Sequence, residues 1–350
     1  MKAIEIGQFV LGEGRPPFVI AELSANHNGS LDHALAIVEA SAKAGAHAIK
    51  LQTYTADTMT IDVAHGEFFI SDPGSLWHGR SLYDLYREAS TPWEWHEPIF
   101  RRCSELGMVG FSTPFDATAV EFLESLDVPC HKIASFENTD VELIARVART
   151  GKPVIMSTGM ATVAEIAESV AVARDNGCRD LVLLKCTSAY PADPASSNLA
   201  TIPHLRALFD CHVGLSDHTM GIGAAVAATA FGAVAIEKHV TLSRDDGGVD
   251  STFSMEPDEL ASLVRETATA ATAVGAISYG ATENEIASRV FRRSLYVVKP
   301  LEAGDILDRD NLRAIRPGLG LPVKHLKDLL GKRVNRRIAR GTALQWDFIA

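Results

Sequence analysis

The sequence has few features of a secreted or membrane-spanning protein. Its five cysteines, at positions 103, 130, 178, 186 and 211, are scattered and include no Cys-x-x-Cys pair. That usage is typical of reduced, structural thiols rather than a disulfide framework. No stretch approaches the roughly 20 apolar residues that a membrane helix needs, and Met1–Glu5 precede no apolar run of the signal-peptide kind. We therefore expect a cytoplasmic protein without a membrane partner.

Charge is distributed unevenly along the chain, whose net charge is −11. Residues 281–350 carry 14 Lys and Arg against 8 Asp and Glu, whereas the rest carries 19 against 36. The change of sign predicts two domains, residues 1–280 and residues 281–350. The basic part has no basic run interleaved with aromatic residues, so we expect it to face an acidic protein surface or an anionic substrate rather than nucleic acid.

Short β-like runs alternate with helix-like stretches between Phe18 and about Ala273. The predicted strands are residues 18–22, 48–52, 108–112, 129–133, 153–157, 181–185, 212–216 and 233–237. Alanine-rich amphipathic stretches such as 31–44, 163–176 and 221–231 separate them. This alternation predicts an α/β fold, a closed (β/α)₈ TIM barrel, which takes roughly 250 residues and leaves room for one small domain. A doubly wound open sheet is the alternative, because a strand count does not prove closure.

Two segments depart from this alternation. Residues 55–95 separate the second predicted strand from its helix, and they are rich in aromatic and charged residues. So long a connection at the catalytic face of a barrel is either functional or a packed surface loop. Beyond residue 281, a strand-like run at 295–298 and turns around Gly304 and Gly341 predict a small domain of short strands.

Polar residues gather at the carboxyl ends of the predicted strands, where barrel enzymes place their active sites. The period of two along a strand puts Lys50 with Gln52, Ser216 with His218, and Glu237 with His239 on one face. Their apolar neighbours, such as Ile49, Leu51, Leu215 and Ile236, take the opposite face, toward the helices. Charged groups inside a barrel are costly unless they are paired or bind a ligand.

His218 and His239 are expected on adjacent strands, where they could share one divalent metal ion. Glu22, Asp217, Glu237 and Asp250 are candidates for further ligands or supporting groups. Two lysines, Lys50 and Lys132, with Lys185 as a third candidate, bring positive charge to the same end of the barrel. Ser and Thr residues after successive strands complete a cradle for phosphate and carboxylate groups. A Schiff-base lysine is the competing interpretation of Lys50 or Lys132, but an imine-forming aldolase needs no metal.

Short motifs that follow one another in order resemble those of the sialic acid synthase (N-acetylneuraminate synthase) family. They are Ile20-Ala21-Glu22, Asn26-His27-Asn28-Gly29, Lys50-Leu51-Gln52-Thr53, Ser112-Thr113-Pro114-Phe115, Lys132-Ile133-Ala134-Ser135, Ser157-Thr158-Gly159-Met160, Gly214-Leu215-Ser216-Asp217-His218-Thr219 and Glu237-Lys238-His239. Residues 301–305 and 316–318 resemble the antifreeze-like (SAF) domain of that family. Residues 76–86, 91–96 and 246–251 resemble its pseudaminic acid synthase branch.

The resemblance implies a reaction and a metal. The substrates would be phosphoenolpyruvate and 2,4-diacetamido-2,4,6-trideoxy-L-altrose, and the products pseudaminic acid and phosphate. A divalent metal on His218 and His239, Mn²⁺ first and Mg²⁺ or Co²⁺ as alternatives, would bind the aldehyde oxygen as a Lewis acid. The family further implies a domain-swapped homodimer, in which Arg316 reaches the barrel of the partner subunit.

The resemblance also implies roles for single residues. Phosphoenolpyruvate would be held by Lys50, Thr113, Lys132, Ser135, Ser157 and Ser216. Glu22, Gln52, Tyr190 and Asp250 would position the sugar, and Glu22, Glu237 or Asp250 would handle protons. Ser188 stands where N-acetylneuraminate synthases have an asparagine, which puts one substrate contact in doubt and fits a different sugar.

Other functions remain open from the sequence alone. An N-acetylneuraminate or legionaminate synthase would use the same barrel, and we expect residues 76–96 to decide the sugar by favouring a hydrophobic deoxy sugar. A heptulosonate synthase would want further Arg and Lys for a second phosphate, and the motifs offer few. A non-catalytic sugar-binding protein would leave the Lys, His and Glu set without a purpose.

Overall fold

The computed structural model describes residues 1–350, which divide into two compact units, Met1–Gly275 and Ala276–Ala350. The sequence placed the boundary at residue 280. Each unit has a hydrophobic core of its own.

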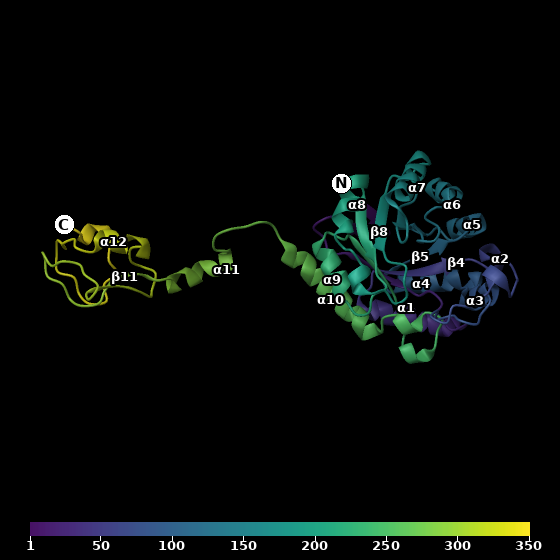
Figure 1. The fold of residues 1–350 in the computed structure, drawn as a ribbon, viewed down its shortest axis with the longest axis horizontal. Helices are drawn as coiled ribbons and strands as arrows, with labels where there is room; N and C mark the ends of the chain where they lie inside the picture. The colour runs from purple at the N-terminus through teal and green to yellow at the C-terminus, as the bar shows by residue number, and fades with distance from the viewer. The chain divides into compact units, whose positions relative to one another are not determined.

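Eight parallel strands of the first unit close into a barrel (Figure 1). The strands are β3 (Phe18–Glu22), β4 (Ala48–Thr53), β5 (Val109–Pro114), β6 (His131–Ile133), β7 (Val154–Ser157), β8 (Leu181–Cys186), β9 (His212–Ser216) and β10 (Ala235–His239). The last strand pairs with the first, from Ala235 opposite Phe18 to His239 opposite Glu22. The predicted TIM barrel is therefore confirmed, and an open sheet is excluded.

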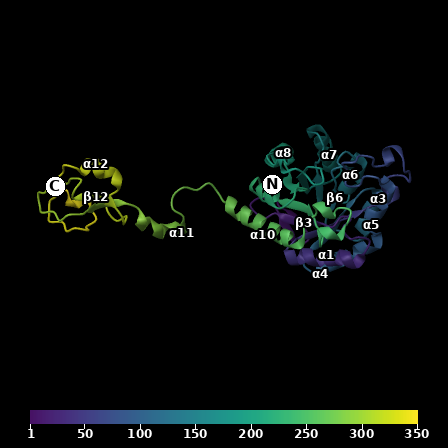
Figure 2. The same cartoon turned by 60° about the horizontal axis from the view of Figure 1, so that its bottom comes forward.

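Helices surround the barrel, as Figure 2 shows from a second direction. They are α1 (Leu31–Ala44), α4 (His96–Glu105), α5 (Ala117–Ser125), α6 (Val141–Ala148), α7 (Val163–Asp175), α8 (Thr201–Phe209), α9 (Gly223–Ala230) and α10 (Pro257–Val274). Local chemistry defines several starts, because Ser30, Asp116, Asp140 and Thr162 accept hydrogen bonds from backbone N–H groups of the first turn.

The strands bury their two faces in different surroundings. Ile49, Leu51, Leu215 and Ile236 pack in the layer between barrel and helices, as the period of two predicted. The inward residues near the amino ends of the strands, among them Ile20, Ala48, Ile155, Val182 and Ala235, form a second apolar cluster inside the barrel. Polar side chains continue the same inward rows toward the carboxyl ends. The barrel thus has an apolar floor beneath a polar cavity.

A short hairpin adds to that floor. Strands β1 (Ile4–Ile6) and β2 (Phe9–Leu11) pair antiparallel, and Ile4, Ile6 and Leu11 join the apolar cluster inside the barrel. The sequence analysis did not predict this hairpin, because three-residue strands carry too few alternations to be recognised.

Residues 55–95 lie between β4 and α4, where the sequence placed them, and contain the helices α2 (Ala56–Met59) and α3 (Leu82–Ala89). We call this segment the β4–α4 excursion. Buried polar contacts fix its two ends. The Nε2 atom of His96 lies 2.8 Å from the hydroxyl of Thr53, and the indole of Trp93 donates to the carbonyl of Tyr54 over 3.4 Å. The imidazole of His27 lies 3.3 Å from the carbonyl of Ala89. The ends of the excursion are therefore packed against the barrel, whereas most residues from 61 to 80 are exposed.

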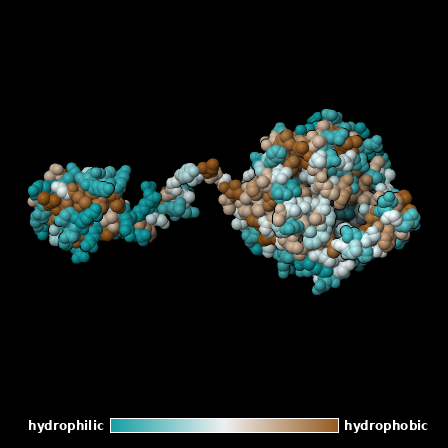
Figure 3. Space-filling view, viewed as in Figure 1, coloured by the Kyte–Doolittle hydropathy of each residue, from teal (hydrophilic) through white to brown (hydrophobic).

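The second unit is a small domain with little regular structure. Strands β11 (Ser294–Val297) and β12 (Leu312–Ile315) pair antiparallel, and two four-residue helices occur, α11 (Glu283–Ile286) and α12 (Leu326–Leu329). Its core contains Leu295, Val297, Leu312 and Leu344. Hydrophilic side chains cover much of the face of this unit seen in Figure 3. Across the whole chain, no helix combines the length and the apolar character needed to cross a bilayer.

Candidate active site

A cavity of about 310 Å³ opens among the carboxyl ends of the barrel strands. Most of the residues expected from the sequence line it, namely Glu22, Lys50, Gln52, Lys132, Ser135, Ser157, Tyr190, Ser216, His218, Glu237, His239 and Asp250. They come from β3, β4, β6, β7, β8, β9 and β10 or from the loops that follow these strands. Closure of the barrel is what brings these distant positions together.

Two lysines and two glutamates form a buried cluster at the bottom of the cavity. Lys50 Nζ lies 2.5 Å from Glu22 Oε2 and 3.5 Å from Glu237 Oε2. Lys132 Nζ donates to Glu237 Oε1 over 3.0 Å, and the hydroxyl of Ser216 donates to the same oxygen over 3.0 Å. Glu237 therefore links both lysines, which would otherwise be two buried like charges.

Burial disfavours the charged form of each group in this cluster, whereas the ion pairs favour it. The balance between the two sets the direction of each pKa shift. Burial acts to lower the pKa of Lys50, but Glu22 and Glu237 outweigh it and raise that pKa. Burial acts to raise the pKa of Glu237, but Lys132 and Lys50 hold it well below its usual range. For Lys132 and Glu22 burial prevails, lowering the first pKa and raising the second. An anion entering the cavity would favour the charged form of Lys132.

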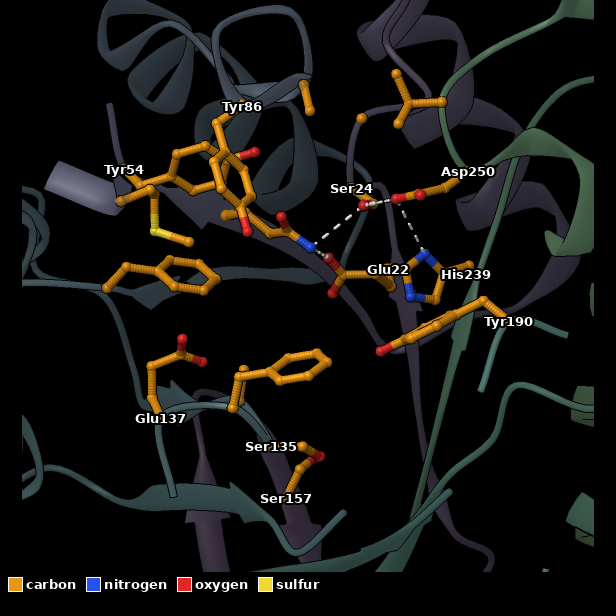
Figure 4. Close-up of a pocket in the computed structure, with 18 of the residues that line it drawn as sticks. Glu22, Ser24, Tyr54, Tyr86, Ser135, Glu137, Ser157, Tyr190, His239 and Asp250 are labelled. Atoms are coloured by element: carbon orange, nitrogen blue, oxygen red, sulfur yellow. Dashed lines mark hydrogen bonds and ion pairs between the residues drawn. The ribbon is translucent and has the colours of Figure 1, made fainter. Parts of the chain in front are cut away.

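A second set of polar groups lies beside Glu22, and Figure 4 shows Ser24, Asp250 and His239 of this set. Gln52 Nε2 donates to Glu22 Oε1 over 3.0 Å and to the hydroxyl of Ser24 over 3.2 Å. That hydroxyl donates in turn to Asp250, whose Oδ2 lies 3.8 Å from Nδ1 of His239. Ser24 holds a φ of 49°, a conformation that non-glycine residues rarely adopt. Burial raises the pKa of the Asp250 carboxyl.

His218 and His239 lie side by side, with 5.3 Å between their ring centroids. Nδ1 of His218 lies 3.0 Å from the carbonyl of Thr187, and Nδ1 of His239 is buried without a hydrogen-bond partner. Neither Nε2 atom is engaged by the protein. Two free imidazole nitrogens suit a transition metal. The protein assembles no group of three His, Cys, Asp or Glu side chains there, so substrate or water would have to complete the coordination.

Hydroxyl groups from neighbouring loops crowd around Gly159, which follows β7. Its backbone N–H donates to the hydroxyl of Ser135 over 3.1 Å. A Cβ at position 159 would lie 2.6 Å from that hydroxyl oxygen and would collide with the hydroxyl of Ser188. Only glycine permits this close approach. The hydroxyl of Ser157 is buried without a partner and so is available to a bound ligand.

Several candidates lie away from the cavity. Thr113 is buried behind it and accepts from Lys50 Nζ over 3.4 Å, while Ser188 packs against Gly159. Lys185 donates to the carbonyl of Cys186 and is not a lining residue. Asp217 is paired with Lys238 at 2.8 Å, so it is not available to a metal beside His218. Arg316 belongs to the second unit, where it is exposed directly after β12.

The structure also adds lining residues that the sequence analysis did not single out as site residues. Among them are Ser24, Tyr54, Tyr86 and Glu137. Ser24 lies two residues beyond the end of β3, and its positive φ departs from the extended backbone on which the period of two depends. No periodic signal identifies Glu137, because it lies in the loop after β6. Tyr54 and Tyr86 belong to the β4–α4 excursion and its start, whose path cannot be read from periodicity.

Comparisons with known proteins agree with this architecture. Residues 37–279 match the NeuB family, and residues 292–350 match the SAF domain. The chain is 42% identical over 342 residues to a pseudaminic acid synthase of Campylobacter jejuni, covering 98% of both chains. It is 34% identical over 346 residues to an N,N'-diacetyllegionaminic acid synthase of Legionella pneumophila, covering 97% of this chain and 96% of that one.

A solved structure of related sequence has the same fold. It is the N-acetylneuraminic acid (sialic acid) synthetase of Leptospira borgpetersenii, which matches with a TM-score of 0.73 and 30% identity. The match covers 82% of this chain and 95% of that one. Together with the barrel, the buried Lys–Glu cluster and the histidine pair, these findings place the chain in the NeuB family, with a SAF domain in its second unit.

Proposed function

We propose that the protein condenses phosphoenolpyruvate with 2,4-diacetamido-2,4,6-trideoxy-L-altrose and water to give pseudaminic acid and phosphate. The observation that carries the proposal is the pairing of a buried lysine cluster with two imidazoles in one cavity. The lysines suit a small substrate with two anionic groups, and the imidazoles suit a metal that polarises a carbonyl group.

The identity of the sugar is supported by the relatives. The pseudaminic acid synthase of Campylobacter jejuni is 42% identical to this chain, and the legionaminic acid synthase is 34% identical at similar coverage. Legionaminate synthesis is therefore the second candidate. N-Acetylneuraminate synthesis is the third, on the resemblance to the Leptospira protein at 30% identity.

The reaction joins C3 of phosphoenolpyruvate to the aldehyde carbon of the open-chain sugar. The aldehyde oxygen takes up a proton and becomes a hydroxyl group, and positive charge develops at C2 of the former phosphoenolpyruvate. Water adds at C2 and releases a proton. The resulting tetrahedral intermediate loses inorganic phosphate by cleavage of the C–O bond, which leaves the keto acid.

The residues of the chain account for binding and proton transfer in this scheme. Lys50 and Lys132 offset the charges of the phosphate and carboxylate groups, assisted by the free hydroxyl of Ser157. Glu237 stays ionised and holds the lysines in place, because both lysines keep its pKa low. In this proposal Glu22 carries the proton for the aldehyde oxygen, since burial raises the pKa of its carboxyl group.

A divalent metal, Mn²⁺ first with Mg²⁺ or Co²⁺ as alternatives, would be held by His218 and His239 and would supply Lewis-acid polarisation of the aldehyde oxygen. The free Nε2 atoms support this assignment. Asp250 and Tyr190 flank the imidazoles, with the Tyr190 ring centroid 4.4 Å from that of His218. In the proposal, both orient the sugar toward the reacting carbon.

We further propose that the active unit is a homodimer, in which the second unit of one chain supplies Arg316 to the cavity of its partner. The resemblance of this unit to the SAF domain supports the idea, as does the charge. Residues 281–350 carry 14 basic and 8 acidic residues, against 19 basic and 36 acidic residues in the rest of the chain.

The test is phosphate release from phosphoenolpyruvate with each candidate sugar in turn. Release with the diacetamido-trideoxy-altrose sugar at least tenfold faster than with the others supports the proposal. Release only with N-acetylmannosamine, or only with the sugar precursor of legionaminate, would overturn the choice of sugar. The absence of phosphate release with every sugar would overturn the proposed reaction itself.

A further inference from the structure

The cavity has a second, apolar side, which the reaction chemistry described above does not use. Tyr54, Ile70, Leu82, Leu85, Tyr86 and Phe115 line it. Four of these belong to the β4–α4 excursion, Tyr54 directly precedes it, and Phe115 follows β5. In Figure 4, Tyr54 and Tyr86 lie on the side of the cavity away from His239 and Asp250. We call this surface the apolar wall.

The apolar wall is held in a defined shape. The rings of Tyr54 and Tyr86 meet edge to face with 5.9 Å between centroids, and those of Tyr54 and Phe115 with 5.1 Å. Tyr54 and Leu85 are buried, at 3% and 6% exposure. The bond from Trp93 to the carbonyl of Tyr54 ties the wall to the barrel. A wall fixed in this way can select a ligand by shape, because it does not simply collapse when the site is empty.

One ionisable group, Glu137, lines the cavity on the same side. Its Oε2 atom is buried and has no hydrogen-bond partner in the protein. A buried carboxylate oxygen without a donor costs free energy. Burial accordingly raises the pKa of Glu137 to about 7, against the weaker opposing effects of a hydrogen bond from its own backbone N–H and of Lys132. The reaction scheme gives Glu137 no part, so the cavity holds a buried acceptor to which no protein group donates.

We propose that the apolar wall and Glu137 form the subsite for the acylamino group at C4 of the sugar. The acyl methyl group packs on the wall, and the amide N–H donates to the Glu137 carboxylate. This inference rests on the proposed function and names the part of the sugar that this side of the cavity recognises. The C4 substituent is assigned because C1 reacts beside the histidines, and the wall lies away from them.

The combination of groups selects an acylamino substituent over the alternatives. A bare methyl group would satisfy the wall but would leave the Glu137 oxygen unpaired. A hydroxyl group would pair with Glu137 but would bring no apolar surface to Leu82 and Leu85. An acylamino group carries both a donor and a methyl group, at a spacing of a few bonds.

The experiment compares two substrates and matched variants. The substrates are the 2,4-diacetamido sugar and the same sugar with hydrogen in place of the C4 acetamido group. Glu137→Ala removes the acceptor, Glu137→Gln retains an acceptor oxygen, and Leu82→Gln makes the wall polar. The controls are Glu142→Gln, an exposed glutamate on α6, and Leu76→Gln, an exposed leucine of the excursion that does not line the cavity.

Wild type should favour the diacetamido sugar, and Glu137→Ala should lower that preference about 10- to 100-fold through a higher KM for this sugar. Leu82→Gln should also lower the preference for the diacetamido sugar. Glu137→Gln should keep most of this preference, and neither control variant should change it. The KM for phosphoenolpyruvate should stay the same in every variant. Thermal unfolding should show Glu137→Ala to be at least as stable as wild type, because this variant removes an unpaired buried acceptor.

Equal losses on both sugars in Glu137→Ala would overturn the subsite, because the residue would then act on folding or on the reaction itself. A raised KM for phosphoenolpyruvate would overturn it as well. If wild type converts both sugars with the same kcat/KM, the enzyme does not recognise the substituent at C4. If wild type is inactive with both test sugars but active with N-acetylmannosamine, the proposed function itself is wrong. This outcome can be told apart from those that overturn only the subsite.

Discussion

At the scale of residues, Glu237 is the centre of the site, because it is the one carboxylate that contacts both buried lysines. Lys132 has its pKa lowered by burial, whereas Lys50 is stabilised in its charged form by two carboxylates. The two lysines are therefore not equivalent. Lys132 gains most from an incoming anion, and its removal should be felt mainly as lost affinity for phosphoenolpyruvate.

Replacing Lys132 with Met tests this assignment. We expect kcat/KM for phosphoenolpyruvate to fall about 10- to 100-fold, the worth of a charge-assisted hydrogen bond. Stability should fall by a few kcal/mol at most, because Glu237 keeps Lys50 and Ser216 as partners. Steady-state kinetics and urea unfolding measure the two effects. Lys185→Met, at a lysine outside the cavity, should leave the kinetics unchanged; an equal loss there would contradict the account.

The histidine pair makes a separate prediction. Treatment with a chelator should abolish phosphate release, and addition of Mn²⁺ should restore it, with Mg²⁺ or Co²⁺ as weaker replacements. His218→Ala and His239→Ala should each weaken Mn²⁺ binding by at least tenfold, as measured by calorimetry. Full activity of the chelator-treated protein would show that the two imidazoles serve another purpose.

The sequence predicted the strand residues of the cavity and several loop residues, namely Ser135, Tyr190, His218 and Asp250, but it missed Ser24 and Glu137. Lys50, Gln52, Ser216 and Glu237 follow from the period of two, because inward rows continue from the apolar floor. Glu137 could not be predicted in this way, because a loop has no period. Asp217 was considered as a metal ligand, but it faces outward and pairs with Lys238.

At the scale of elements, the β4–α4 excursion depends on a buried histidine at the start of α4. Nδ1 of His96 lies 3.2 Å from the carbonyl of Trp93, and its Nε2 lies 2.8 Å from the hydroxyl of Thr53. A neutral imidazole satisfies both contacts by donating at Nδ1 and accepting at Nε2. Burial lowers the pKa of His96 to about 4, in keeping with this neutral form.

The lowered pKa makes the stability of the protein sensitive to acid. Between pH 6.5 and pH 4 the unfolded chain binds a proton at His96 that the folded protein does not, so stability rises with pH in this window. Wild type should therefore lose up to about 3 kcal/mol of stability from this group as pH falls from 6.5 to 4. The free energy of unfolding of His96→Asn should fall less than that of wild type between pH 6.5 and pH 4. Urea unfolding at both pH values measures the difference. The exposed His204→Asn should behave like wild type; equal acid losses in wild type and His96→Asn would refute the assignment.

The strands of the barrel could be predicted, although their ends could not. The eighth strand was expected at residues 233–237 and lies at Ala235–His239, so it includes the second metal-ligand candidate. The fourth was expected from residue 129 and begins at His131. Proline cannot donate to a strand ladder, which accounts for the later start after Pro129. The hairpin β1–β2 was missed because its strands are too short for a periodic signal.

At the scale of the whole molecule, the two units have separate hydrophobic cores, so each should fold without the other. Deletion of residues 281–350 should then leave a folded barrel with its cooperative unfolding transition, but without synthase activity if Arg316 acts in the partner's cavity. Circular dichroism and phosphate release check the two halves of this prediction. Arg316→Ala in the full chain should lower activity in the same direction. A fully active truncated protein would contradict the dimer proposal.

The central claim is that this cavity joins phosphoenolpyruvate to the diacetamido sugar with loss of phosphate by C–O cleavage. The most direct test is to run the reaction in ¹⁸O-labelled water and to weigh both products. We predict a sugar acid with the mass of pseudaminic acid increased by the ¹⁸O that water places on C2, together with phosphate that carries no label, because water adds at carbon. Labelled phosphate, or no condensation product from this sugar, would contradict the account.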